Sequence, residues 1–479
     1  MTKTRTVNLI AIAFVCSTLV ACKPDFSNFV AVGDSLTAGF ADGALYQDGQ
    51  LNSYPSILAT QFSQLEGASF NQPLMSDNLG GLLFGGNSHP SYPTRLVLNT
   101  TTGAPETLFG VPSTEVYDVI NGPFNNMGVP GAKSFHLIST DYGDPAGLSL
   151  DPATANPYFV RFASWVNTSI VADAASQNPS FFVLWVGNND VLSYATGGGV
   201  GIDQLGNADT STYAHNDITD PGVFVEAYSS TLDSLSASGG SGALINIPDV
   251  SAIPFFTTVT YNAIPMDQEG ADLANSGYTA YNAGIEAAYN AGAITLEELQ
   301  RRAIVFSAGQ NPVVINDEYL SDLTARALPS YRQATSNELL LLTTGAILGN
   351  AVSHSDSRLW GISAPLEDKH ILVADEIKLI ETARLSYNQT IKELAKNNYQ
   401  LVYVDAAALL EALKSGINYG SGSISSAYIT GGAFSLDGVH LTARGYAVLS
   451  NEIIDTINIG FGADIARVDP GNYPTIYSK

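Results

Sequence analysis

The feature that most constrains this fold is a series of short apolar runs, each ended by turn residues, that alternate with helical patterns. Continuous apolar runs of about four to eight residues bounded by turn residues are typical of buried strands. We expect strands over Phe29–Val32, Val116–Ile120, Phe181–Val186, Ala243–Ile247 and Leu401–Val404. Strands that alternate with helices predict a parallel sheet covered on both faces, with reactive groups at the carboxyl ends of the strands.

Helical spacing of apolar residues fills much of the remaining chain. We expect helices over Tyr54–Leu65, Phe159–Gln177, Phe224–Ala237, Ala271–Asn290, Thr295–Ala303, Glu376–Asn397 and Leu441–Ile457. Three long irregular stretches are expected to be insertions: 67–115, which is rich in Gly, Pro, Asn and Ser, 195–222, which is rich in Gly, Asp, Asn and Thr, and 305–370. They do not resemble separate domains, because the motifs described below straddle them. The apolar run from Leu339 to Val352 is too short to span a membrane, and we expect a buried helix or a flap over a cleft.

Composition favours a globular protein with an acidic surface. The 479 residues are 45% hydrophobic, which is enough to bury a large core. The formal net charge of −25 would repel phosphate backbones, so we expect no nucleic-acid partner.

The first residues resemble a targeting signal. Lys3 and Arg5 precede a short apolar segment, and Leu19-Val20-Ala21-Cys22 resembles the lipobox of bacterial lipoproteins. We therefore expect a signal peptide over 1–21, acylation of Cys22, and a lipidated tether over 22–27 ahead of the domain at 28–479. The alternative is an ordinary secretory signal with a chance cysteine. By resemblance to bacterial sorting rules, Lys23 favours the outer membrane.

Cysteine usage excludes several kinds of site. The only other cysteine, Cys16, lies inside the signal, so a mature chain acylated at Cys22 has no thiol left. A cysteine protease, a cysteine-based zinc site and an iron–sulfur site are thereby excluded. The histidines at 89, 136, 215, 354 and 370 share no spacing typical of metal ligands. We expect no metal and no cofactor.

Two distant segments carry residues suited to nucleophilic catalysis. Ser35 directly follows an apolar run, and Asp437 lies three residues before His440. A serine hydroxyl is a poor nucleophile until a base takes its proton, and that base needs an acceptor that holds its tautomer. The spacing of Asp437 and His440 places both side chains on one turn. No Gly-x-Ser-x-Gly elbow in a suitable context is present, which argues against an α/β-hydrolase fold.

Four segments resemble the ordered blocks of the SGNH/GDSL hydrolase family, and in particular its large bacterial lipoproteins. They are Gly33-Asp34-Ser35-Leu36, Asn126 to Gly131, Gly187 to Asp190, and Asp437 to His440. The resemblance implies an α/β fold: a three-layer α/β/α sandwich, flavodoxin-like, whose five-stranded parallel sheet has the order 2-1-3-4-5. It also implies that Ser35 is the nucleophile, His440 the general base and Asp437 the residue that orients His440.

The same resemblance implies an oxyanion hole. Its donors would be the backbone N–H of Ser35, the N–H of Gly131 and the side chain of Asn189. Gly128 competes for the second position and Asn188 for the third, because the third block reads Gly-Asn-Asn-Asp where the family usually has Gly-x-Asn-Asp. We expect structural roles for Asp34, in its turn, and for Asp190.

The resulting hypothesis is a serine esterase or lipase-type acylhydrolase that cleaves carboxylic esters through an acyl-serine intermediate. The substrate is left open among lipids, other acyl esters and acetylated glycans, because a fold does not choose among them. Two alternatives remain: a polysaccharide deacetylase of the same fold, and a binding lipoprotein without turnover. The expected location is the bacterial cell envelope, with the lipid anchor holding the protein on a membrane.

Overall fold

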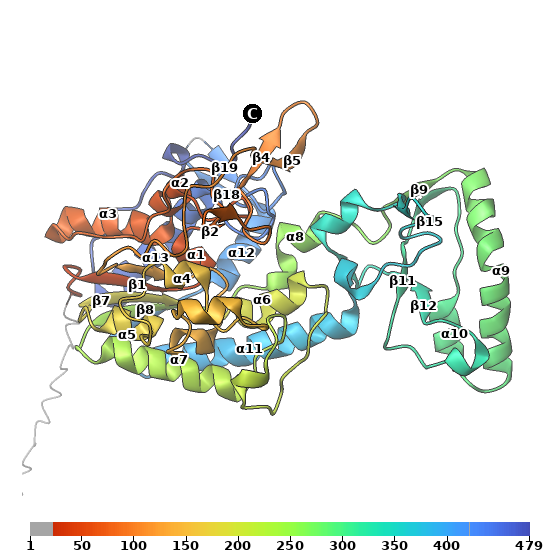
Figure 1. The fold of residues 1–479 in the computed structure, drawn as a ribbon, viewed down its shortest axis with the longest axis horizontal. Helices are drawn as coiled ribbons and strands as arrows, with labels where there is room; N and C mark the ends of the chain where they lie inside the picture. The colour runs from red at the N-terminus through yellow and green to blue at the C-terminus, as the bar shows by residue number, and fades with distance from the viewer. Residues whose placement is uncertain (1–22, 421) are drawn as a thin grey trace, which may run out of the picture.

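A five-stranded parallel sheet forms the centre of the molecule (Figure 1). The computed structural model describes residues 23–420 and 422–479. The strands are β1 (Phe29–Gly33), β6 (Asn126–Gly128), β7 (Phe181–Trp185), β8 (Ser241–Ile245) and β17 (Leu401–Val404). Their order across the sheet is β6-β1-β7-β8-β17, and all pairs are parallel. Numbered along the chain, this is 2-1-3-4-5, so the expected parallel sheet and its strand order are confirmed.

The central strands are buried along their whole length, which explains why their sequences are continuously apolar. Every residue of β1 and of β7 is buried. Helices lie on both sides of the sheet in Figure 1: α3 and α13 on one side, and α5, α7 and α11 on the other. The helices are α1 (Ser35–Ala38), α2 (Gln47–Leu51), α3 (Tyr54–Glu66), α4 (Pro157–Val160), α5 (Ile170–Ala175), α6 (Asn189–Thr196), α7 (Pro221–Ser236), α8 (Pro254–Thr257), α9 (Gln268–Asn290), α10 (Leu296–Arg302), α11 (Ala374–Lys396), α12 (Ala406–Ser415) and α13 (Ala443–Phe461).

Two elements predicted around the central sheet are wrong. Residues 116–120 form turns and irregular chain, and the second strand of the sheet is β6, a few residues later. The strand escapes a search for apolar runs because it is short and contains Asn126, whose side-chain amide is satisfied inside the protein by Thr37 O at 3.0 Å. The helix expected over Phe159–Gln177 is broken into α4 and α5, since Ser169 starts a new helix by accepting a hydrogen bond from the Ala172 N–H.

We call residues 258–373 the inserted module, most of which, including α9, α10, β9, β11, β12 and β15, lies apart from the sheet (Figure 1, at the right). It contains α9, α10 and small antiparallel pairs: β9 (Ile264–Met266) with β10 (Gly309–Asn311), β11 (Val314–Asn316) with β12 (Tyr331–Gln333), β13 (Leu339–Leu340) with β16 (Ile371–Leu372), and β14 (Ala351–Ser353) with β15 (Asp356–Leu359). Two apolar clusters, separate from the main core, stabilise it. The module therefore begins earlier in the chain than the insertion expected at 305–370.

The run from Leu339 to Val352 is not one helix. It passes through β13, a short 3₁₀ turn at Leu342–Ala346 and into β14. Leu340 and Leu341 are buried. The expectation of a single buried helix is thus wrong for this segment.

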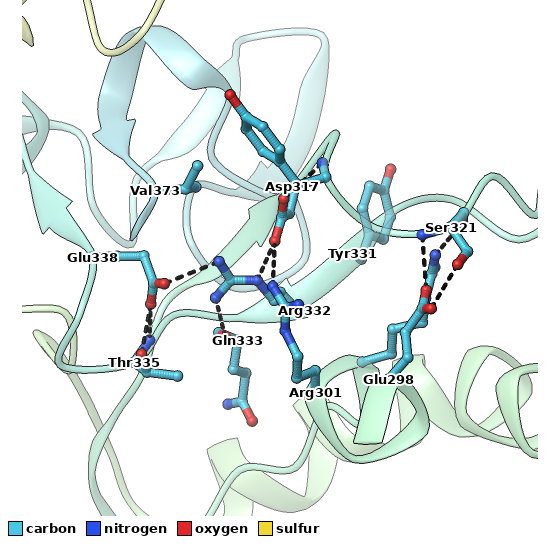
Figure 2. A network of polar contacts seen from close by, with 12 residues as sticks. Glu298, Arg301, Asp317, Ser321, Tyr331, Arg332, Gln333, Thr335, Glu338 and Val373 are labelled. Atoms are coloured by element: carbon cyan, nitrogen blue, oxygen red, sulfur yellow. Dashed lines mark hydrogen bonds and ion pairs between the residues drawn. The ribbon is translucent and has the colours of Figure 1, made fainter. Parts of the chain in front are cut away.

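A buried ion network cross-links the inserted module (Figure 2). Arg332 on β12 lies between two carboxylates, with its Nε 2.5 Å from Asp317 Oδ2 and one terminal nitrogen 3.0 Å from Glu338 Oε1. Asp317 also contacts Arg301 of α10 at 3.3 Å, and Glu338 accepts hydrogen bonds from Thr335. The three central side chains are at most 4% exposed. A groove of about 820 Å³ lies on the same module, lined by α9 and the Leu328–Tyr331 segment.

The remaining strands form hairpins around the core. They are β2 (Leu83–Phe84) with β3 (Asn87–Ser88), β4 (Leu96–Asn99) with β5 (Ala104–Thr107), and β18 (Ile417–Tyr419) with β19 (Gly422–Ile424).

Candidate active site

The candidate site lies beyond the carboxyl ends of the central strands, where polar loops follow β1, β6 and β7. Ser35 is the first residue of α1, directly after β1. Asp34 caps this short helix: its Oδ1 accepts a hydrogen bond from the Leu36 N–H at 3.0 Å, and its Oδ2 accepts one from Asn188 Nδ2 at 2.8 Å. The cap fixes the start of α1 and links it to the loop after β7. It therefore fixes the position of the serine.

The structure brings Ser35, His440 and Asp437 together from segments 405 residues apart. His440 Nε2 lies 2.9 Å from Ser35 Oγ, and His440 Nδ1 lies 2.9 Å from Asp437 Oδ2. When the ring proton is on Nδ1 and faces the carboxylate, Nε2 offers its lone pair to the serine hydroxyl. This geometry is what proton abstraction from a serine requires.

Five hydrogen bonds converge on the Asp437 carboxylate. Oδ1 accepts from the N–H groups of Val439 and His440, each at 2.9 Å, and from Ser435 Oγ at 3.0 Å. Oδ2 accepts from the Gly43 N–H and faces His440 Nδ1. Burial alone would raise the pKa of Asp437, but the neighbouring imidazole and these donors outweigh it and hold the pKa well below its ordinary value. The group therefore stays ionised and can stabilise an imidazolium.

Gly131 and Gly128 differ in what their N–H groups can reach. Gly131 has φ +83°, a conformation that favours glycine, and its N–H meets no acceptor among the residues that the structure describes. The N–H of Gly128 is already bonded to Asn126 Oδ1 at 3.0 Å. A Cβ on Gly128 would lie 2.3 Å from Ala38 N, so Gly128 is a packing position beneath α1. Of the two candidates, Gly131 has the N–H that is still available to a ligand.

The two adjacent asparagines, Asn188 and Asn189, also differ in their contacts. Asn188 donates to the Asp34 carboxylate, whereas Asn189 donates one amide proton to Ala132 O at 2.9 Å, next to Gly131. An asparagine amide carries two protons, so a second remains for a ligand. Asp190 holds the facing loop, because it accepts from the N–H and the hydroxyl of Ser134 at 2.9 and 2.6 Å.

Asp34 is fully buried beneath the site. Burial raises its pKa to about 6, although the hydrogen bonds from Asn188 and Leu36 and the charge of His440 act in the opposite direction. No contact in the structure joins Asp34 to the reacting atoms of Ser35 or His440. Its bonds fit the structural role expected from the sequence.

Aromatic side chains continue outward from the imidazole. The Phe40 ring packs against His440 with centroids 4.7 Å apart, and Tyr158, Tyr92 and Phe84 follow at centroid separations of 5.7–6.5 Å. Tyr117 packs edge-on against Phe84 and is 49% exposed. We call these residues the aromatic row.

The inserted module contacts the turn between the acid and the histidine. The Phe255 N–H of α8, the helix that ends directly before the module and forms its base, donates to Gly438 O at 2.9 Å. Gly438 has φ +72°, and a Cβ there would lie 3.1 Å from Leu342 Cδ2. The module base thus packs directly against the turn that carries Asp437 and His440.

Sequence reasoning missed Asp42, Gly43 and Ser435, which surround Asp437. One signal was available: Asp-Gly between two alanines is a strong signal for a tight hairpin turn, seven residues after the serine. Nothing in the sequence indicates what such a turn would contact.

Among residues 23–420 and 422–479 there is no cluster of three or more His, Cys, Asp or Glu side chains that could hold a metal ion. Within the same residues no helix has the length and apolar character needed to cross a membrane. The expected signal peptide and Cys22 lie outside the described residues. No protein-family model matches the chain, and no curated protein matches it.

Proposed function

We propose that this protein is a serine hydrolase that cleaves carboxylic esters. The observation that carries the proposal is the continuous series of contacts from Asp437 through His440 to Ser35, with both hydrogen-bond distances at 2.9 Å. A serine hydroxyl, an imidazole and a largely buried carboxylate connected in this order are typical of nucleophilic catalysis by serine.

In the proposed reaction, His440 Nε2 takes the proton of Ser35 as Oγ attacks the ester carbonyl carbon. The negative charge that develops on the carbonyl oxygen is stabilised by the N–H groups of Ser35 and Gly131 and by the Asn189 amide. The C–O bond then breaks, and His440 gives its proton to the departing alcohol. Water, deprotonated by the same imidazole, then attacks the acyl carbon. The bond from that carbon to Ser35 Oγ breaks, His440 returns the proton to Oγ, and the carboxylic acid is released.

The same observations favour the SGNH/GDSL family and its three-layer α/β/α sandwich. The strand order and the helices on both sides of the sheet support this assignment. So do the hydrogen bonds that join the four polar segments, from Asn188 to Asp34, from Asn189 to Ala132 and between His440 and Ser35. We further propose that Cys22 is acylated and anchors the enzyme in the bacterial envelope at the outer membrane. A Cys22→Ser variant should then appear in the soluble fraction, whereas the wild type sediments with membranes.

A second candidate substrate class is the acetylated glycan. The aromatic row favours it, because it runs from His440 to Tyr117, whose half-exposed ring can stack on a sugar ring of an extended glycan. The two substrate classes are distinguished by comparing the rate of acetate release from acetylated xylan with the rate of fatty-acid release from phospholipid. A Tyr117→Ala variant should raise KM for the glycan and leave a small aryl ester unaffected.

Labelling by a fluorophosphonate probe tests the proposed function directly. The wild type should form one covalent adduct at Ser35, and Ser35→Ala should form none. Ser63→Ala, which removes an α3 hydroxyl that donates to Thr60 O, is the matched control and should label like the wild type. A protein that binds esters without turnover would show no adduct in any of the three.

A further inference from the structure

A two-residue turn follows the nucleophile helix and faces the candidate acid. Ala41 and Ala44 exchange backbone hydrogen bonds at 3.1 Å, and the residues between them, Asp42 and Gly43, have φ +54° and +76°. Positive φ at both central residues is the pattern of a type I′ turn, which Asp-Gly favours. The turn thus has a defined shape.

Three hydrogen bonds connect this turn to the loop that carries Asp437. The Gly43 N–H donates to Asp437 Oδ2 at 2.9 Å, and the Asp42 N–H donates to Ser435 Oγ at 2.9 Å. In the opposite direction, the Leu436 N–H donates to Asp42 Oδ1 at 3.0 Å. Since Ser435 Oγ in turn donates to Asp437 Oδ1, both oxygens of the acid are held from the turn.

The Asp42 carboxylate is 1% exposed, a costly position for a charged group. Its second oxygen accepts a hydrogen bond from Tyr46 Oη at 2.8 Å. The Arg95 guanidinium stacks on Tyr46 and Tyr477, 4.9 and 4.4 Å from the ring centroids. Burial and the nearby Asp437 raise the pKa of Asp42 to about 6, against the opposing effects of Leu436, Tyr46 and Arg95. The buried Asp42 carboxylate thus lies near a second carboxylate, that of Asp437, and each of its oxygens accepts a hydrogen bond, from Tyr46 and from Leu436.

We propose that Asp42 and Gly43 form a clamp that positions Asp437 against His440, so that Asp42 is a positioning residue of the catalytic reaction. This inference rests on the proposed hydrolase function. It explains how one short N-terminal segment serves both halves of the site: Ser35 supplies the hydroxyl, and the turn seven residues later holds the acid from the far end of the chain. Aligning the acid aligns the imidazole, and misplacing a catalytic group by about 1 Å can lower a rate about 10²-fold.

The alternative is that the turn only stabilises the fold. The two interpretations predict different values of kcat per active site. A purely structural role would lower the fraction of active protein and the melting temperature, while kcat per titrated site stayed unchanged. A positioning role lowers kcat per titrated site.

The test compares two substitutions that keep the turn and differ in the carboxylate. Asp42→Gly removes the side chain without strain, because glycine adopts positive φ readily. Asp42→Asn keeps an oxygen that accepts from the Leu436 N–H, and asparagine also tolerates this conformation. The control is Asp77→Asn, which alters a loop carboxylate that accepts N–H groups of Leu79, Gly80 and Ser113 and does not contact the triad. Active sites are counted by fluorophosphonate titration, and kcat and KM are measured on a small aryl ester.

We expect Asp42→Gly to lower kcat per titrated site by about 10- to 100-fold with KM within about twofold of the wild type. Asp42→Asn should retain kcat within about threefold, and Asp77→Asn should match the wild type. Ser435→Ala should lower kcat less than Asp42→Gly, and the double variant should show less than the product of the two effects, because both residues act on Asp437. An Asp42→Gly enzyme with wild-type kcat per titrated site overturns the clamp. A wild type that neither labels nor hydrolyses esters overturns the proposed function instead, so the two failures are distinguishable.

Discussion

Two buried charge networks, one at the candidate site and one in the inserted module, pair carboxylates with nitrogen donors but differ in what each leaves open. In the module, Arg332 lies between Asp317 and Glu338, and all three side chains are at most 4% exposed (Figure 2). At the candidate site, the side chains of His440 and Asp437 are 14% and 13% exposed, and the series ends in the hydroxyl of Ser35.

The difference teaches how to separate charge used for structure from charge used for chemistry. The module network is closed, since each charged group has a charged or backbone partner inside the protein. The site network is open at one end, because Ser35 Oγ bonds only to His440 Nε2 and the Gly131 N–H has no acceptor among the residues that the structure describes. Disturbing the first network should therefore change stability, and disturbing the second should change turnover.

The largest expected effect is on turnover, from Ser35→Ala. Removal of the proposed nucleophile should lower kcat/KM on an activated ester by about 10⁴-fold or more, because the remaining groups would supply only binding and oxyanion stabilisation. The melting temperature should stay close to that of the wild type, since Ser35 makes one side-chain hydrogen bond, to His440. Ester turnover and thermal unfolding, measured on the same preparation, test both halves of the statement. Turnover by Ser35→Ala near the wild-type rate would show that Ser35 is not the nucleophile, and the proposed difference between the two networks would fail.

Next is the closed network, tested by Arg332→Met. The substitution leaves Asp317 and Glu338 buried without their main partner, so the free energy of unfolding should fall by about 3–5 kcal/mol. The matched control is Arg358→Met, which removes an exposed, solvent-screened pair with Asp356 and should leave the free energy of unfolding close to that of the wild type. We expect Arg332→Met to lose much of its stability while its kcat per titrated site stays unchanged. Equal losses in both variants would show that burial does not distinguish these pairs.

Sequence reasoning reached the sheet more readily than the contacts around the acid. The runs at Phe181 and Leu401 are apolar without interruption because both faces of the sheet are covered, so their periodicity is informative. Strand β6 was missed because its burial depends on Asn126 finding partners that are distant in sequence. Asp42 was missed for the same reason: its environment is made by Ser435 and Leu436, and no local pattern encodes a contact across the whole chain.

The proposed oxyanion donors give a smaller expected effect on turnover. Asn189→Ala should lower kcat by about 10²–10³-fold, with little change in KM, because the second amide proton acts on charge that develops only in the transition state. Asn188→Ala is the companion measurement. It removes the bond to Asp34 rather than a donor to the substrate, so its effect should fall on stability first. A larger kcat loss for Asn188→Ala than for Asn189→Ala would reverse the assignment of the two asparagines.

The smallest expected effect concerns Glu376, where the chain leaves the inserted module and enters α11. Glu376 is 2% exposed, accepts a hydrogen bond from the Val373 N–H at 2.8 Å, and lies close against Gly199. Burial, together with nearby acidic groups such as Glu318 and Asp368, raises its pKa to about 8. Since this folded-state pKa lies above the value of about 4.3 in an unfolded chain, the stabilisation is complete below about pH 4 and is lost as the pH rises through about 8.

Between pH 5 and pH 7, this one group should lower the free energy of unfolding by about 2–3 kcal/mol. Glu376→Gln, which cannot ionise, should remove that slope and become more stable than the wild type as the pH rises. Glu393→Gln, on the same helix, is the control and should keep the wild-type slope. Thermal unfolding at pH 5, 6 and 7 measures the difference. If the stability of Glu376→Gln and of the wild type changed with pH in the same way, water or local rearrangement would stabilise the ionised Glu376. The junction would then resemble the candidate site, which is partly exposed, more than the fully buried network of the module.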